Sequence, residues 1–492
     1  MANPLKQLAG ETAIYGLSTI LARIVNFLLV PLYTRVLIEA DYGVVTEFMA
    51  IIAILQVVLT LGLETGCFRF ASREGVNAPS VFANAFIEVT ALSAVFFTAT
   101  CIFSPDIASA MGYEGFGNVI VYIGAILLLD CSTAIIFARL RYEHKAVKFA
   151  VIKTVKIFTE VAVNLVLYLV MPLRFAAGGS LWLLNFVSAA PDFTYAIFAI
   201  FVSCIVCLIL LLPELLRLEW KCDGKLCRQL LAYSLPLMIA GLPGVLNDFL
   251  DRVLMRFLNA DPVLWRADLG VYQAGVKIAV IMQLFIQMFR YAAEPFFFQR
   301  SSEKGSDKLY AKVMNWFVAF CMFGFLCITL FIDQVGLIIG KNFRDGLAIA
   351  PIMLMAYVAL GMLFNVNMWY KLSGKTGYAV WITLAGLVVT VVINAVWMPV
   401  YSYHAAAWAH LASYAVMLLI SVLLGNRYYK IPYNWSVILT LIVLGTAFYA
   451  AGAVLPQMEL PLYAELAVKA LILVIFTALA YRMLMRTSKV ER

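Results

Sequence analysis

Four polar side chains, Lys153, Lys156, Glu160 and Asn164, interrupt one long apolar stretch. Their spacings of 3, 4 and 4 residues place them on one face of an α-helix. The two lysines could bind an anionic group such as phosphate, or their long side chains could simply extend to nearby water. Glu160 lies deeper in the stretch, where it could carry a coupling ion or form an ion pair with Lys156.

A second polar stripe lies in the first apolar stretch and includes Arg23 and Asn26. A guanidinium group can grip two phosphate oxygens at once, which makes Arg23 a candidate for binding a phosphorylated substrate. The alternative is an internal ion pair that joins two helices.

The segment NDFLDR supplies two acids one helical turn apart, Asp248 and Asp251, followed by Arg252. Two carboxylates at this spacing could share a proton, which suits a proton-coupled or cation-coupled step. The alternative is a helix end exposed to water. Pro236 and Pro243 precede the segment and predict a kink or break in its helix.

Three further charges stand alone in apolar stretches. Lys277 is a second candidate for binding an anionic headgroup. Glu88 and Asp130 could each bind a coupling ion, or each could form a hydrogen bond between two helices. Such charges cost roughly 2.5–3.5 kcal/mol each at the centre of a membrane helix, so they should face a cavity or a partner.

The composition excludes a soluble protein. Of 492 residues, 64% are hydrophobic and 13% are charged, and the mean hydropathy is +0.93. Soluble domains carry about 25% charged residues. Because a membrane helix needs about 20 apolar residues, the chain predicts about fourteen spans. They are 12–35, 44–66, 80–104, 118–139, 149–171, 193–213, 230–254, 269–293, 312–333, 347–370, 377–398, 404–425, 434–455 and 462–485.

The distribution of Lys and Arg predicts the orientation. With the N-terminus in the cytoplasm, the cytoplasmic connections and span ends hold about 26 of the 36 cations, and the outer side holds about 8. This bias follows the positive-inside rule. It predicts that both termini are cytoplasmic.

The chain also contains an internal repeat. The pattern Tyr15-Gly16-Leu17, Asp41–Val44 and Phe68–Ala71 returns as Tyr233-Ser234-Leu235, Asp268–Val271 and Phe289–Ala292. Six spans separate the copies, so the two copies have the same orientation. We therefore expect two six-helix lobes, 1–221 and 222–430, followed by an extra helix pair and cytoplasmic tail at 431–492.

Residues 15–72 resemble the polysaccharide-exporter branch of the multidrug/oligosaccharidyl-lipid/polysaccharide (MATE-like) superfamily, which includes the O-antigen and lipid II flippases. The matching features are an Arg in the first span, Asp41-Tyr42-Gly43, Leu61–Glu64 and Arg69-Phe70. The resemblance implies two parallel six-helix lobes around a central cavity that opens alternately to each side. Fourteen spans are typical of the lipid-linked branch, whereas drug exporters typically have twelve.

The expected function is therefore a flippase rather than an enzyme. It would move a polyprenyl-pyrophosphate-linked oligosaccharide across the bacterial inner membrane for envelope polysaccharide assembly, with H⁺ or Na⁺ as a coupling ion. A multidrug exporter and a lipid II flippase are the alternatives. We find no nucleotide-binding loop, metal-ligand set or nucleophile–base pair, so we expect no cofactor, metal or nucleic-acid partner. Contact with polysaccharide polymerase machinery would fit this function.

Overall fold

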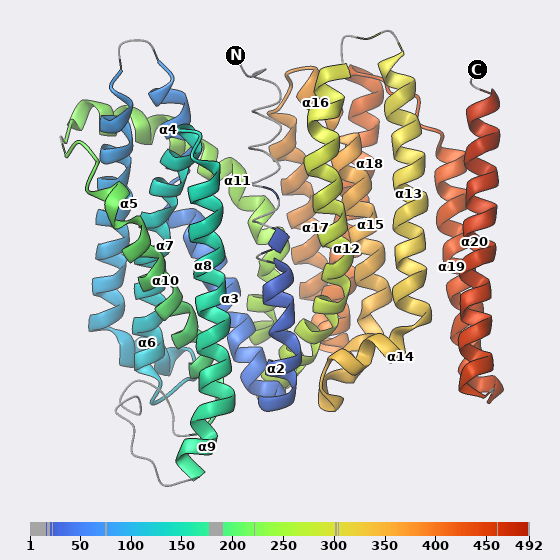
Figure 1. Ribbon diagram of the computed structural model, residues 1–492, viewed down its shortest axis with the longest axis horizontal. Helices are drawn as coiled ribbons and strands as arrows, with labels where there is room; N and C mark the ends of the chain where they lie inside the picture. Colours follow the sequence, from blue (N-terminus) through green and yellow to red (C-terminus); the bar gives the residue numbers. More distant parts are fainter. Residues whose placement is uncertain are drawn as a thin grey trace. The chain divides into compact units, whose positions relative to one another are not determined.

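The computed structural model describes residues 16, 20–21, 23–73, 76–176, 190–220, 222–300, 303, 305–459 and 461–490 (Figure 1). Within these ranges every regular element is a helix. This is the expected consequence of long apolar segments in lipid, where each backbone N–H and C=O must find its partner within the segment. The predicted all-α polytopic fold is confirmed.

Thirteen helical segments in the described part of the chain are long and apolar enough to cross a membrane. They correspond one by one to the second to fourteenth predicted spans. Most ends differ by a few residues, as in the predicted span 193–213 and the observed Phe193–Leu215. The first predicted span, 12–35, lies partly outside the described residues. Its described part is helical and continues to Val36.

The chain divides into two compact units, and the first contains residues 1–257 and 262–270. In this unit α7 is flanked by α5 and α10, and α10 packs in turn on α8 (Figure 1). The apolar side chains Ile126, Leu127 and Ile135 of α7 are fully buried. The helices of this unit are α2 (Val30–Val36), α3 (Glu39–Leu59), α4 (Leu63–Ala71), α5 (Ala78–Ile102), α6 (Ser104–Ala110), α7 (Gly117–Tyr142), α8 (Ala146–Leu165), α9 (Met171–Ala176), α10 (Phe193–Leu215) and α11 (Gly224–Leu258).

The second unit contains residues 258–261 and 271–492. Here α15 packs on α13 and α18, α17 packs on α18, and the pair α19–α20 packs on α13 (Figure 1). The helix α12 (Trp265–Arg300) begins in the first unit and continues in the second. The other helices are α13 (Ser306–Leu330), α14 (Ile332–Val335), α15 (Ala350–Val366), α16 (Met368–Leu372), α17 (Tyr378–Tyr401), α18 (Tyr403–Tyr428), α19 (Trp435–Val454) and α20 (Leu462–Val490).

The helix α11 belongs to the first unit, whereas the division expected from the repeat assigned it to the second lobe. Its contacts explain the difference. The Tyr233 ring lies 6.0 Å from the Phe70 ring and 4.1 Å from the Arg69 guanidinium. At the other end of α11, the Arg256 side chain binds Glu47 of α3. The helix runs unbroken through both prolines, so the predicted break is absent, and the prediction of a kink remains.

Two corresponding glycines of the repeat, Gly43 and Gly270, lie against each other where α3 and α12 begin. A Cβ added to Gly43 would collide with the Arg266 carbonyl, and one added to Gly270 would collide with the Glu39 carbonyl. Arg266 lies four residues before Gly270, and Glu39 lies four residues before Gly43. The first turns of α3 and α12 therefore pack against each other in equivalent ways, with their backbones too close to leave room for a Cβ at either glycine.

A helix break separates α3 from α4 within the second span. Leu61 and Gly62 there adopt positive φ values of 54° and 67°. A leucine in this conformation costs roughly 1–2 kcal/mol. The break places Glu64 in the first turn of α4, where the helix dipole favours a negative charge.

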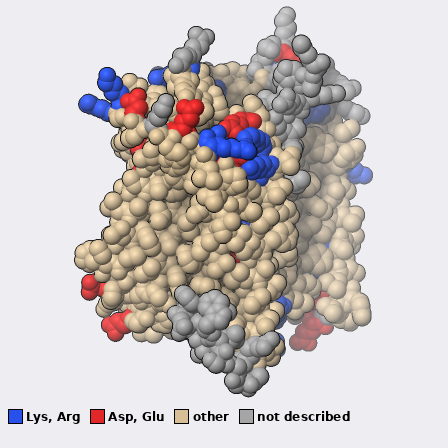
Figure 2. Space-filling model, turned by 60° about the vertical axis from the view of Figure 1, so that its left-hand side comes forward, with Lys and Arg blue, Asp and Glu red and all other residues tan. Residues whose placement is uncertain are grey.

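Charged residues gather near the two ends of the first unit. On the face in Figure 2, the band between those ends is almost wholly uncharged. This distribution is the one expected for a unit whose middle lies in hydrocarbon.

Candidate functional site

The centre of the candidate site is an ion pair between α7 and α8. Lys156 Nζ lies 2.5 Å from Asp130 Oδ1, and the two side chains are only 15% and 18% exposed. The Cys204 thiol of α10 also donates to Asp130 Oδ1, over 3.3 Å. Asp130 is thus not a lone acid. It is the carboxylate that joins three helices of the first unit.

A second cation, Lys153, lies one turn before Lys156 on the same face of α8. Its ammonium group is 4.3 Å from the centre of the Phe137 ring and within electrostatic range of Asp130 and Lys156. Lys153 therefore adds a second cation beside the Lys156–Asp130 pair. The two lysines lie in the middle of α8, and together they carry more positive charge than Asp130 neutralises. They could therefore bind an anionic group.

The deeper part of the predicted stripe reaches α2. The Tyr33 hydroxyl donates to Asn164 Oδ1 over 2.9 Å, and the Asn164 amide donates to the Glu160 carbonyl over 2.8 Å. A π-helical turn, Val166–Val170, follows directly. Such turns recur at functional sites in helices. Glu160 is half-buried and takes part in an interaction of its own.

At the cytoplasm-facing end expected for this unit, Glu64 binds Arg141. The distance from Arg141 Nη2 to Glu64 Oε2 is 2.6 Å, and both side chains are partly exposed. Arg141 also lies 5.3 Å from the Phe68 ring. This pair joins α4 to α7 near Lys153, which lies within electrostatic range of Glu64.

The acids of α11 have different environments. Asp251 is fully buried and accepts a hydrogen bond of 2.9 Å from Arg252, whereas Asp248 is exposed. Arg252 also donates to the Asp248 carbonyl over 2.6 Å. The alternative of a helix end in water is therefore wrong for Asp251.

The remaining predicted residues have other environments. Arg23 is exposed, and the buried Asn26 Oδ1 accepts no hydrogen bond from the described residues. Lys277 is half-buried on α12 and takes part in an interaction of its own. The Glu88 oxygens are buried beside the Cys227 thiol, and neither accepts a well-formed hydrogen bond within the described ranges.

The sequence analysis missed a network around Glu47 of α3. Both Glu47 oxygens bind the Arg256 guanidinium, each over 2.5 Å. Tyr113 donates to Glu47, and Arg256 donates to the Met111 carbonyl. Burial and the Glu47 charge raise the pKa of the Tyr113 hydroxyl, which keeps it a donor. A single acid in the apolar stretch 44–63 was the available signal.

A match over more than half of the chain identifies its family. A family model described as "Polysaccharide biosynthesis protein" matches residues 8–301. The chain belongs to this family. The match covers every predicted site residue, including Lys277. No curated protein matches the sequence.

Several solved structures of membrane transport proteins have a fold similar to that of this chain. A structure titled "Lipid II flippase MurJ, inward closed conformation" has a TM-score of 0.68 at 10% identity, over 96% of this chain and 99% of that one. An inward-facing multidrug resistance MATE transporter of the MOP superfamily has a TM-score of 0.56 at 15% identity, over 85% and 94%. A MOP superfamily transporter from Pyrococcus furiosus has a TM-score of 0.54 at 13% identity, over 86% and 94%.

The chain therefore belongs to the polysaccharide biosynthesis family, and its fold is the one seen in the lipid II flippase and the MATE transporters.

Proposed function

We propose that this protein is a flippase for a polyprenyl-pyrophosphate-linked oligosaccharide. It would carry the headgroup from the inner to the outer leaflet of the bacterial cytoplasmic membrane by alternating access, for envelope polysaccharide assembly. The observation that carries the proposal is membership of the polysaccharide biosynthesis family. The charge in the candidate site gives a chemical reason, since Lys153 adds a second cation beside the Lys156–Asp130 pair.

In this proposal the cations bind the pyrophosphate. Lys153 and Lys156 are the first candidates, and Arg23, with Asn26 a turn away, would contribute from the first span. Arg252 and Lys277 remain weaker candidates; Arg252 binds Asp251, as Lys156 binds Asp130, and Lys277 has an interaction of its own. The polyprenyl chain would remain in the bilayer during the passage of the headgroup.

An ion gradient would supply the energy, with H⁺ or Na⁺ as the coupling ion. Asp130, Glu160, Asp251, Asp248 and Glu88 are the candidate carriers. Glu88 is of interest because its buried oxygens lack a well-formed hydrogen bond from the described residues. Protonation would remove the cost of that buried charge.

The proposed topology has both termini in the cytoplasm. It follows from the bias of Lys and Arg toward one side of the membrane. Contact with the enzymes that polymerise the glycan outside the membrane would fit this orientation.

One genetic experiment tests the transport direction and the substrate class. After deletion of the gene, we expect lipid-linked oligosaccharide to accumulate in the inner leaflet, and we expect a plasmid copy to reverse this. Unchanged lipid-linked sugars together with increased drug sensitivity would instead identify a drug exporter.

A second experiment tests the cation site. Proteoliposomes that contain a fluorescent polyprenyl-pyrophosphate-linked oligosaccharide should show protein-dependent flipping. Arg23→Ala should abolish it, and Arg23→Lys should retain part of it because the charge remains. Full flipping by the Arg23→Ala protein would exclude Arg23 from the site.

The second candidate function is flipping of lipid II, which the fold likeness to the MurJ flippase favours. The same proteoliposomes distinguish the two substrates. Efficient flipping of lipid II with no flipping of the oligosaccharide lipid would favour this candidate.

A further inference from the structure

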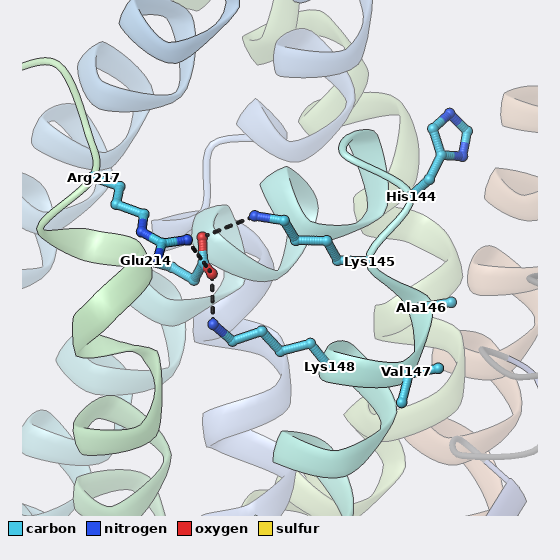
Figure 3. Close-up of a pocket in the computed structure, with 7 residues that line it drawn as sticks. All are labelled: His144, Lys145, Ala146, Val147, Lys148, Glu214 and Arg217. Carbon is cyan, nitrogen blue, oxygen red and sulfur yellow. Dashed lines mark hydrogen bonds and ion pairs between the residues drawn. The ribbon is translucent and has the colours of Figure 1, made fainter.

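A pocket of about 470 Å³ opens where α8 begins, lined by residues 144–148, Glu214 and Arg217. Figure 3 shows that the charged ends of Lys145, Lys148 and Arg217 converge on the Glu214 carboxylate. Their nitrogen atoms lie 3.4, 2.5 and 3.7 Å from its oxygens. Three cations, from the start of α8 and the turn that follows α10, thus meet at one acid.

The pocket holds more cations than carboxylates, and part of this positive charge is exposed at the surface. The Glu214 side chain is only 1% exposed, whereas that of Arg217 is 66% exposed. A second acid, Glu143, binds Lys145 over 2.6 Å and Arg139 over 2.5 Å. Four cations therefore surround two carboxylates. Since an ammonium group has three donors and a guanidinium five, donors remain for another acceptor.

The start of α8 adds to this positive potential. Ala146 and Val147 line the pocket in the first turn of the helix. Backbone N–H groups in a first turn lack an acceptor within their own helix, and the dipole there favours an anion. The cations and the helix end therefore favour the same ligand charge.

An apolar stripe leads away from the pocket along α8. Val147, Val151, Val155 and Phe158 are all exposed, and their spacings of 4, 4 and 3 residues place them on one face. Val147 also lines the pocket. The cationic pocket and the apolar stripe thus meet at one residue. A free phosphate compound would use only the pocket, whereas a lipid would occupy both.

We propose that this pocket and the stripe bind a phosphate group carried by a lipid. The headgroup contacts Lys145, Lys148 and Arg217, and the acyl or prenyl chain lies along the exposed face of α8. The positive-inside bias assigns this lipid to the cytoplasmic leaflet. The site does not depend on which solute the protein transports.

The test is native mass spectrometry of the purified full-length protein with defined lipids. Phosphatidylglycerol should bind more tightly than phosphatidylcholine. The double variant Lys148→Gln/Arg217→Gln should lose about thirtyfold in affinity for phosphatidylglycerol, because each cation near a membrane surface contributes about fivefold. The matched control Lys225→Gln/Arg228→Gln removes two exposed cations that do not line the pocket. They act on the bound headgroup only through attraction that salt screens, so affinity should change by less than about threefold.

Folding is controlled separately. Lys148→Arg keeps the charge and should retain binding. Because the double variant removes two cations from the buried Glu214 carboxylate, it should unfold at a lower temperature than the parent protein, so binding is compared at a temperature at which thermal unfolding in detergent shows every variant to be folded. An additional arm adds undecaprenyl phosphate as a competitor. Displacement of phosphatidylglycerol would identify a polyprenyl lipid as the ligand, and retention would identify a glycerophospholipid.

Three results would overturn the proposal. Equal binding of the two phospholipids would show that the pocket does not select a net negative headgroup. Equal losses in the pocket variant and the control variant would indicate a general surface effect. Competition by inorganic pyrophosphate as strong as that of a lipid would remove the role of the apolar stripe.

Discussion

Breaking the pair between Asp130 and Lys156 should destabilise the protein more than losing both charges at once. Asp130→Asn keeps the side-chain volume but leaves the Lys156 ammonium without its anion. Removal of one partner of a fully buried pair costs roughly 3–5 kcal/mol. Because the two side chains are 18% and 15% exposed, we expect about 2–3 kcal/mol of lost stability. Lys156→Met should cost a similar amount.

The double variant Asp130→Asn/Lys156→Met should recover most of this loss, since neither member of the pair is left without the other and Lys153 keeps Glu64 within electrostatic range. The resulting coupling energy should be about 2 kcal/mol. The measurement is denaturant unfolding of the purified protein in detergent, followed by tryptophan fluorescence, for all four proteins of the cycle.

The matched control is the exposed pair Arg300–Glu303, with an N–O distance of 2.9 Å and side chains 49% and 53% exposed. Its coupling energy should lie below about 0.5 kcal/mol, as for other surface ion pairs. Strictly additive losses at Asp130 and Lys156, or a coupling no larger than in the control, would refute the reasoning.

Three further predictions concern the first unit. Glu47→Gln should lower the unfolding temperature in detergent more than Glu64→Gln, because the first breaks a buried bidentate pair and the second a partly exposed one; equal shifts would contradict this. Gly43→Ala should reduce stability because its Cβ would meet a backbone carbonyl, whereas Gly241→Ala, with open space around the new methyl group, should not; equal unfolding temperatures would exclude the proposed clash. Burial alone would raise the pKa of Glu143, but hydrogen bonds from two neighbouring cations outweigh it and lower the pKa. Its stabilising effect should therefore be present above the unfolded pKa of about 4.3 and be lost as pH falls through the folded pKa. Glu143→Gln should cost less than about 1 kcal/mol near neutrality and progressively less as the pH is lowered below about 4.3, as checked by unfolding over that pH range.

The sequence predicted the spans well because span length and apolarity are local properties. The predicted span 434–455 and the observed Trp435–Met458 show this agreement. The seventh span was predicted as 230–254, but α11 covers Gly224–Leu258. Its ends are polar, and hydropathy cannot show that a helix continues beyond the hydrocarbon.

The candidate site was predicted only in part. Spacing placed Lys153 and Lys156 on one face of a helix, but it could not show which neighbouring helix that face meets. The partner of Lys156 is Asp130, 26 residues earlier, and the partner of Arg256 is Glu47, 209 residues earlier. Such pairs depend on how helices pack, which helical periodicity does not encode.

The cations around Glu214 also bear on how the chain enters the membrane. Lys145 and Lys148 precede Glu214 by more than 60 residues, so they leave the ribosome well before their acid does. During insertion of α8 neither lysine can yet bind Glu214, and Glu143 is the acid already available to Lys145, so Lys148 acts at full strength to retain that end on the proposed cytoplasmic side. Only when α10 is in place can Glu214 bind them. The same lysines thus first orient α8 in the membrane and later bind α10 through Glu214. A substitution at Glu214 should therefore impair assembly of the unit without reversing its topology.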